Sequence, residues 1–275
     1  MDLGVHLPLI PFGSTLSLER LAAVTDAARE CGFAALAAND HFVFRTPWLD
    51  GPTALASMVE RSGELELATT LALVVLRGPA ALAKALEALD VLSGGRVVAA
   101  VGPGSSAQDY ELAGIPFAER WQRFDAALAA LRERSSVPLW VGSWGSKAGL
   151  ARVARAGDGW LASAYNTTPE RFAAARADLA AALARRGRDA DGFPNALSTM
   201  WTWVCDGRAE AERALADLAA VLGREPEELR DRVCVGPPEH CARLLDQYVR
   251  AGCGRVYVWP LGDERRQLER LAALG

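Results

Sequence analysis

The sequence predicts a (β/α)8 barrel, and two observations carry that prediction. Eight short apolar runs rich in Val, Leu and Ala alternate with stretches of helical periodicity. Near-continuous apolar strands separated by helices indicate a parallel sheet that is buried on both faces. Eight such units within 275 residues fit a closed barrel better than the alternative, an open doubly wound sheet.

The individual elements follow from the same pattern. The expected strands are residues 3–7, 33–38, 65–75, 96–101, 137–141, 159–162, 197–205 and 255–259. The expected helices are residues 17–31, 53–62, 79–92, 117–134, 146–156, 169–187, 207–222, 237–251 and 264–274. Ser17 suits the amino-terminal cap of the first helix, and Gly32 suits the position just past its end. Because no linker or low-complexity segment interrupts the alternation, we expect one domain over 1–275.

Composition excludes several classes of function. The 30 Lys and Arg residues against 34 Asp and Glu give a net charge of −4, which offers no attraction for nucleic acid or an anionic membrane. No apolar run reaches the roughly 18 residues of a spanning helix, and the first residues lack the basic region of a signal peptide. Five scattered cysteines without a CxxC pair indicate reduced thiols, so we expect a cytoplasmic protein.

The residue patterns of three common kinds of catalysis, by a metal ion, a Schiff-base lysine and a serine nucleophile, are missing from the sequence. The three histidines form no HxH or HExxH pair, so we expect no metal site; an all-carboxylate magnesium site stays open, although no DxD motif marks one. The two lysines, Lys84 and Lys147, fall inside or at the start of expected helices and not at a strand end, where a Schiff-base lysine would lie. A G-x-S-x-G nucleophile elbow is also missing.

Functional residues of a barrel follow the carboxyl ends of its strands. Two glycine-rich loops occupy such positions, 102–106 (GPGSS) and 142–146 (GSWGS), and both precede helical segments. Backbone N–H groups beside a helix start bind anions. Such loops also occur without any ligand, but two after neighbouring strands favour an anionic cofactor.

A dense polar cluster, 39–42 (NDHF), follows the second strand. Asp40 either accepts hydrogen bonds from a ligand or caps the next segment, and His41 is suited to move a proton near neutral pH. Tryptophans gather near strand ends and favour an apolar mouth for a flat ring system, with simple core filling as the alternative for each. These tryptophans are Trp48, Trp144, Trp201, Trp203 and Trp259.

Several motifs together resemble a known family. They are LDVLSGGRVV at 89–98, GPG at 102–104 and GIPFAER at 114–120, supported by NDH at 39–41, VGS at 141–143, GDGW at 157–160 and GPPE at 236–239. The chain resembles the bacterial luciferase-like monooxygenase superfamily, and within it the branch that uses coenzyme F420, a deazaflavin. The resemblance covers nearly the whole chain and implies a (β/α)8 barrel that holds a flavin or deazaflavin at its carboxyl mouth.

The resemblance also implies roles for single residues. Asp40 and His41 would contact the deazaflavin, with His41 as the acid or base. Thr70, Leu71 and Ala72 match the place of a non-proline cis peptide behind the ring. Gln108 stands where deazaflavin-dependent sugar-phosphate dehydrogenases carry an asparagine against the ring. The remaining expected cofactor contacts are Gly104 and the phosphate loop Gly142, Ser143, Gly145 and Ser146.

Two departures from the family pattern shape the expected substrate site. Ser105 stands where those dehydrogenases have a catalytic glutamate, so a sugar phosphate is not the expected substrate. Residues 132–136 join a helix directly to the fifth strand, where relatives usually carry a long insertion. The mouth is therefore expected to be open or completed by a partner subunit. The expected substrate-pocket residues are His6, Trp48, Ser105, Trp201 and Trp203.

The sequence thus predicts an oxidoreductase that transfers a hydride between coenzyme F420 and an unidentified small organic substrate, acting as a homodimer. Two alternatives stay open at this point. One is an FMN-dependent monooxygenase that receives reduced FMN from a separate reductase. The other is a truncated barrel that binds a flavin without catalysis.

Overall fold

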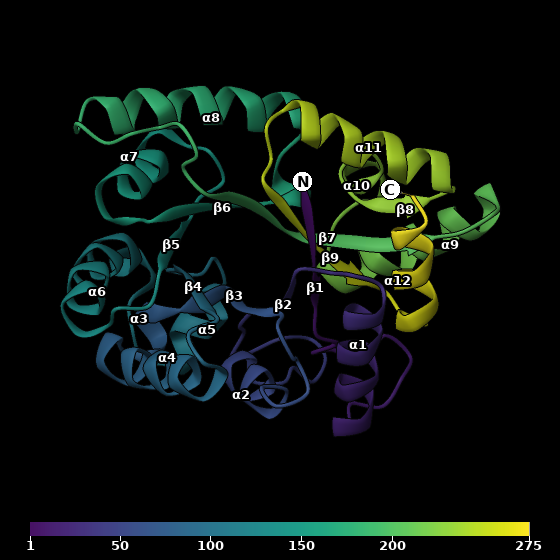
Figure 1. The fold of residues 1–275 in the computed structure, drawn as a ribbon, viewed down its shortest axis with the longest axis horizontal. Coiled ribbons are helices and arrows are strands. Elements are labelled where there is room, and N and C mark those ends of the chain that lie inside the picture. Colours follow the sequence, from purple (N-terminus) through teal and green to yellow (C-terminus); the bar gives the residue numbers. More distant parts are fainter. Residues whose placement is uncertain (275) are drawn as a thin grey trace.

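The computed structural model describes residues 1–274, in which eight parallel strands close into a barrel (Figure 1). The barrel strands are β1 (Asp2–His6), β2 (Ala35–Ala38), β3 (Glu66–Leu73), β4 (Val97–Gly102), β5 (Leu139–Gly142), β6 (Gly159–Ser163), β7 (Asn195–Val204) and β9 (Arg255–Pro260). Neighbours pair in parallel from β1 to β7, and β9 closes the ring between β7 and β1. Ring closure confirms the barrel and rules out the open doubly wound sheet.

Helices surround the ring and connect its strands (Figure 1). The main helices are α1 (Leu18–Glu30), α2 (Gly51–Ser57), α4 (Pro79–Ser93), α6 (Arg120–Arg134), α7 (Lys147–Ala156), α8 (Pro169–Ala184), α9 (Arg208–Leu222), α11 (Pro238–Arg250) and α12 (Glu264–Ala272). The short ones are α3 (Val74–Arg77), α5 (Ala107–Leu112), α10 (Pro226–Leu229) and the 3-10 turns η1 (Phe117–Glu119) and η2 (Ala164–Asn166). Within residues 1–274, the helices all fall short of the length and apolarity that a membrane crossing requires.

The expected elements differ from the structure mainly where elements are short. The expected strand at 65–75 ends at Leu73 and turns into α3, and the expected helix at 53–62 ends at Ser57. The expected helix at 117–134 divides into η1 and α6. A three-residue strand, β8 (Cys234–Gly236), pairs with the carboxyl-terminal part of β7 outside the ring. Elements this short carry too few residues for periodicity to reveal them.

Three local predictions are confirmed. Ser17 caps α1, since its hydroxyl oxygen accepts the amide of Arg20 at 3.2 Å. Gly32 adopts a left-handed φ of +75° just past the end of α1, where a residue with a side chain would be disfavoured. The link from α6 to β5 is short, because α6 ends at Arg134 and β5 begins at Leu139.

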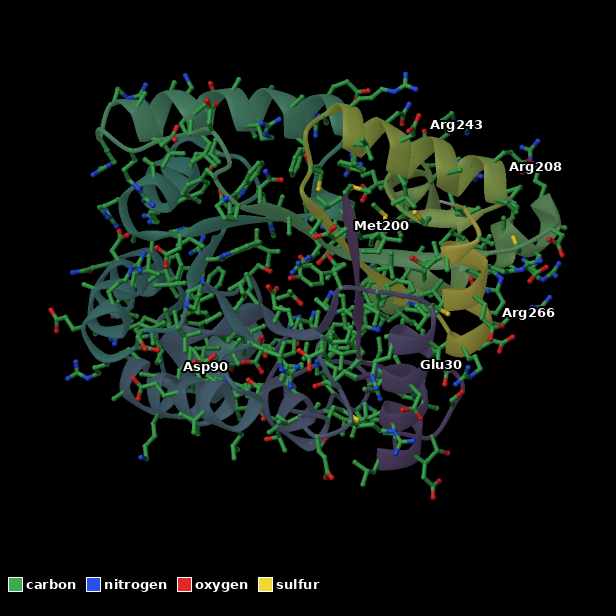
Figure 2. All side chains as sticks on the ribbon, viewed as in Figure 1. Glu30, Asp90, Met200, Arg208, Arg243 and Arg266 are labelled. Carbon is green, nitrogen blue, oxygen red and sulfur yellow. The ribbon has the colours of Figure 1, made fainter. Side chains whose placement is uncertain are left out.

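The apolar core has two parts. One lies between the strands and the helices, and the other fills the inside of the barrel. The inner core is built mainly from alanines, together with the large rings of Trp140 and Tyr257, which occupy the space that the small side chains leave. Figure 2 shows Met200, which belongs to the first part of the core, among the buried side chains, while Arg208 and Arg266 extend from the periphery.

Candidate functional site

A cavity of about 400 Å³ opens at the carboxyl ends of strands β2 to β7. Its lining comes from the strand ends and the loops that follow them: Asn39, Asp40, His41, Thr70, Leu71, Leu73, Pro103, Gly104, Ser105, Phe117, Arg120, Trp121, Gly142, Ser143, Trp144, Leu161, Ala162, Ser163, Tyr165, Ser198 and Thr199. This is the end of the barrel at which the fold predicted functional residues.

The structure brings together half of the predicted site residues. The predicted residues that line the cavity are Asp40, His41, Thr70, Leu71, Gly104, Ser105, Gly142 and Ser143. Gly145 and Ser146 follow at the start of α7, and Ala72 is buried within β3. Gln108 is exposed on α5 and does not line the cavity, contrary to its expected place against a cofactor ring.

His41 lines the cavity, and a hydrogen bond to Asp109 fixes the orientation of its ring. Its Nδ1 lies 3.1 Å from Oδ2 of Asp109, a buried residue of α5. The other oxygen of Asp109 accepts the backbone amides of Phe42 at 3.1 Å and Val43 at 2.7 Å. Because a carboxylate only accepts, Nδ1 of His41 donates its hydrogen, and Nε2 of the neutral ring keeps its lone pair. This arrangement suits His41 to exchange a proton through Nε2.

Asp40 also lines the cavity, but its carboxylate is engaged within the protein. Arg77 donates to both of its oxygens, from Nε at 2.5 Å and from Nη2 at 2.7 Å, and the amide of Leu73 donates at 3.2 Å. Burial alone would lower the pKa of Arg77, but the hydrogen bonds and charges of Asp40 and Asp50 outweigh it and raise that pKa above its ordinary value. Arg77 therefore stays charged, and the pair ties the end of β2 to α3.

The floor of the cavity is formed by the end of β3. The Thr70–Leu71 peptide bond is cis, as the resemblance implied for this position. The Leu71 side chain lies over two neighbouring glycines, Gly102 and Gly142. A Cβ atom added at Gly102 would lie 2.6 Å from Cδ2 of Leu71, and one added at Gly142 would lie 2.5 Å from the same atom. The glycines at the ends of β4 and β5 therefore make room for Leu71.

Replacing Gly142 by alanine is expected to displace Leu71, to lower the free energy of unfolding by about 1–3 kcal/mol through overpacking, and to weaken ligand binding in the cavity. Urea unfolding measures the first effect. Gly207→Ala is the matched control, since a Cβ there meets nothing within 4 Å and its φ of −131° is extended. Equal stability of the two variants would contradict this assignment.

One end of the cavity is suited to an anion. Ser143 Oγ accepts the amide of Gly145 at 3.2 Å, and Ser146 Oγ caps α7 by accepting the amide of Gly149 at 3.2 Å. The start of α7, where the helix dipole is positive, thus follows directly on the lining residues. Arg120 also lines the cavity, with its guanidinium 4.0 Å over the ring of Phe117. No carboxylate of the described residues forms an ion pair with Arg120.

Of the five tryptophans expected at the mouth, Trp144 lines the cavity and the other four do not. Trp201 and Trp259 stack at 4.3 Å on the β7 and β9 side of the barrel, and Trp48 meets Trp259 edge-on at 5.7 Å. His6 stacks on the other face of this group, against Trp259 at 4.4 Å, and Trp203 donates its indole hydrogen to Glu210 at 3.0 Å. The expected pocket residues His6, Trp48, Trp201 and Trp203 therefore lie outside the cavity lining.

Sequence reasoning missed the partners that hold the site together. Asp109, Arg77 and Arg120 were assigned no role, although Arg120 belongs to the motif GIPFAER at 114–120. Trp121, which was not among the expected tryptophans, also lines the cavity. The available signal for Asp109 was an acidic residue in the first turn of α5, the helix that follows β4.

Metal ligands and reactive thiols form no second candidate site among residues 1–274. No three His, Cys, Asp or Glu side chains of residues 1–274 lie together as metal ligands. All five cysteines are free thiols. Burial raises the pKa of Cys205 and raises that of Cys253 to about 12, so neither is an activated nucleophile.

Comparison with known proteins places these features in context. The sequence pattern of the luciferase-like monooxygenase family matches residues 6–134 and 129–227. An F420-dependent glucose-6-phosphate dehydrogenase of Beutenbergia cavernae is 30% identical over 221 residues, which are 74% of this chain and 62% of that enzyme. An uncharacterized protein of Mycobacterium tuberculosis is 32% identical over 111 residues, 31% of this chain and 38% of that protein. The chain thus spans less than two thirds of the length of these curated relatives.

Solved structures share the fold over the full chain. An F420-dependent secondary alcohol dehydrogenase, in complex with an F420–acetone adduct, superposes with a TM-score of 0.87 at 14% identity and covers 100% of this chain and 98% of its own. The oxygenating constituent of 3,6-diketocamphane monooxygenase from Pseudomonas putida, in complex with FMN, gives 0.75 at 15% identity and covers 99% and 96%. At these identities the likeness establishes the barrel and nothing finer.

Proposed function

The chain belongs to the luciferase-like monooxygenase family, and from that premise we propose that it transfers a hydride between coenzyme F420 and a small organic substrate. The observation that carries the proposal is the cavity at the carboxyl mouth. It combines a proton-exchanging side chain, His41, with an anion-binding end at Arg120 and the loop before α7. The relatives named as F420-dependent support the choice of cofactor.

The residues present fit a deazaflavin. Leu71, Leu73 and Pro103 offer an apolar wall of the kind that a flat ring packs against, and the cavity volume falls within the usual range for ligand sites. Arg120, Ser143 and the first turn of α7 would hold the phosphate of the cofactor. When bound, the deazaflavin supplies hydride transfer, and the protein supplies position and the proton.

The chain's own residues then have separate tasks. His41 gives or takes the proton at Nε2, while Asp109 holds the ring in the required tautomer. Leu71 supports the site from below. Trp144, a residue that is 59% exposed at the rim, would shield the site from water when a ligand is bound.

An FMN-dependent monooxygenase is the second candidate, because an FMN complex is among the solved structures that share this fold. The two candidates differ in the ring that the cavity accepts. The third reading, a non-catalytic barrel, predicts cofactor binding without turnover.

Titration of the purified protein with F420 and with FMN, followed by tryptophan quenching, tests the proposal. We expect submicromolar binding of F420 and binding of FMN that is weaker by at least about tenfold. Arg120→Ala is expected to weaken F420 binding by about 10- to 100-fold, because a charge-assisted hydrogen bond is lost. Arg123→Ala is the matched control, since Arg123 pairs with Glu119 on the exposed face of the same helix. Tight FMN binding without F420 binding would overturn the proposal.

A further inference from the structure

A second cavity, of about 450 Å³, opens at the amino ends of the barrel strands, opposite the candidate functional site. Its floor contains the first residues of four strands: Asp2 of β1, Glu66 of β3, Asn195 of β7 and Arg255 of β9. One wall is helix α8, which lies beside α11 along the upper edge of Figure 1. The volume falls within the usual range of ligand sites, so the cavity is large enough for a small organic molecule.

The wall that α8 forms is apolar except for one arginine. Its lining residues recur at the three- and four-residue spacing that places side chains on one face of a helix: Arg176, Leu179, Ala180 and Leu183. Leu179 and Leu183 are buried, whereas Arg176 is exposed. Because a helix rises 1.5 Å per residue, this face runs about 10 Å from Arg176 to Leu183. The cavity therefore has a charged end and an apolar end.

The apolar end is completed by side chains that are held by their own packing. Trp140 is 8% exposed and belongs to the core inside the barrel. Phe193 lies under the guanidinium of Arg188, 5.3 Å from it, and Pro194 follows Phe193 in the lining. These rings and the two leucines of α8 form an apolar surface without any movement of the chain.

Two hydrogen-bond donors of the charged end are anchored to the same turn, between α11 and β9. Nη1 of Arg176 donates to the carbonyl oxygen of Ala251 at 3.1 Å, and a Cβ atom at Gly252 would lie 1.7 Å from that nitrogen. The amide of Gly254 donates to Oδ1 of Asn195 at 2.9 Å, so Nδ2 of Asn195 remains a donor. The turn thus holds a guanidinium and an amide NH2 group at one side of the cavity.

The donors at this side are largely unused. A guanidinium carries five N–H groups, and Ala251 accepts one of those of Arg176. Among residues 1–274, Arg176 forms no ion pair with a carboxylate, and Nδ2 of Asn195 has no hydrogen-bond partner. A carboxylate has two oxygens that accept several hydrogen bonds, so it matches this pair of donors.

The charges at the floor are balanced mainly among themselves. Nη1 of Arg255 pairs with Glu66 and donates to the hydroxyl of Tyr257 at 3.3 Å, and Nη2 lies 3.5 Å from Oδ2 of Asp2. The floor therefore carries two carboxylates for one guanidinium. A ligand with one negative charge is favoured, because a second anionic group in this cavity would approach Asp2 and Glu66.

We propose that this cavity binds a monocarboxylate with an apolar body about 10 Å long, such as an arylalkanoic acid. Arg176 and Asn195 hold the carboxylate by hydrogen bonds, of which those from Arg176 are charge-assisted. Leu179, Leu183 and Phe193 remove the apolar body from water. The two cavities share no lining residue, and the core inside the barrel lies between them. The site therefore goes beyond the proposed function and does not depend on the cofactor.

Isothermal titration calorimetry of the full chain tests the proposal with three probes of nearly equal shape. They are 4-phenylbutanoate, the neutral 4-phenylbutanamide and the cationic 4-phenylbutylamine. We expect one molecule of 4-phenylbutanoate to bind per chain, at least about tenfold more tightly than the amide, because the amide forms no charge-assisted hydrogen bond with Arg176. The amine is expected to bind more weakly than both.

A charge variant examines the carboxylate end. Arg176→Gln is expected to weaken binding of 4-phenylbutanoate by about 10- to 100-fold. Arg171→Gln is the matched control, since Arg171 is exposed on the same helix outside the cavity lining, and it is expected to change affinity less than about twofold.

A filling variant examines the apolar end. Ala180→Phe places a ring inside the cavity and is expected to abolish binding of 4-phenylbutanoate. Ala177→Phe is its control, because Ala177 is exposed on α8 outside the lining, so the same ring enters solvent and binding is retained. If a variant fails to fold, the comparison of the three probes on the unmodified protein still decides.

The proposal is overturned if 4-phenylbutanoate does not bind at millimolar concentration, if the amide or the amine binds as tightly, or if Arg176→Gln keeps the affinity. Arg120→Ala changes the anion-binding end of the other cavity and is expected to leave binding of 4-phenylbutanoate unchanged. A loss in that variant would place the ligand at the carboxyl mouth and also overturn the proposal. F420 takes no part in these titrations, so their result is separate from that of the proposed function.

Discussion

Replacing Asp40 by asparagine is expected to lower the free energy of unfolding by about 3 kcal/mol, because removing one partner of a buried ion pair leaves the other charge without compensation. The Asp40 side chain is 1% exposed and that of Arg77 is 18% exposed. Asparagine fills nearly the same volume, so the loss reports charge and hydrogen bonding and not a cavity. The value falls at the lower end for such pairs because Asp50 still contacts Arg77.

Urea unfolding of the purified variant measures this effect. Asp246→Asn is the matched control: Asp246 pairs with Arg250 on α11, both side chains are more than half exposed, and such pairs are worth about 0–1 kcal/mol. A loss no larger in Asp40→Asn than in the control would show that Asp50 replaces Asp40 as the partner of Arg77.

Replacing His41 by alanine is expected to reduce turnover by about 10²- to 10⁴-fold, the usual contribution of a general acid or base. F420 affinity is expected to change little, because in the proposed complex Arg120 and the loop before α7 would hold the anionic end of the cofactor. The change in deazaflavin absorbance with a substrate found by screening measures turnover. Unchanged turnover would remove His41 from the reaction.

Two further variants make the His41 test specific. Asp109→Asn is expected to retain an oxygen acceptor for the amides of Phe42 and Val43, while its NH2 group opposes Nδ1 of His41 and favours the wrong tautomer. Turnover should therefore fall and its pH profile should shift, while the fold is kept. His240→Ala is the control, since His240 lies on α11 outside the cavity lining, and it should leave turnover within about twofold.

Much of the barrel was readable from local pattern. The run RVVAAV became β4, and the turn before it contains Gly94 and Gly95 at φ of +72° and +84°, which glycine adopts without strain. The place of the candidate site followed from the barrel rule together with two glycine loops and the polar cluster at 39–42. Those signals are short range, so they survive in a single sequence.

The partners within the site depend on long-range contacts that no local pattern encodes. Arg77 meets Asp40 across 37 residues, and Asp109 meets His41 across 68. The direction of Trp201 depends on the register that sets it beside Trp259 across β7 and β9. The glycine at 142 was expected to leave space for a phosphate, yet the space against its Cα is taken by Leu71.

The alanine-rich barrel interior has a consequence for the order of events. Trp140 and Tyr257 belong to the packed core inside the barrel, so the cavity at the carboxyl ends of the strands is separated from a second cavity of about 450 Å³ at the opposite end, which Trp140 also lines. Within the described residues there is then no passage through the barrel, so a cofactor and a substrate that both bind at the carboxyl end would enter through the same opening. Whichever molecule sits deeper must arrive first and depart last, so steady-state kinetics should be sequential and ordered.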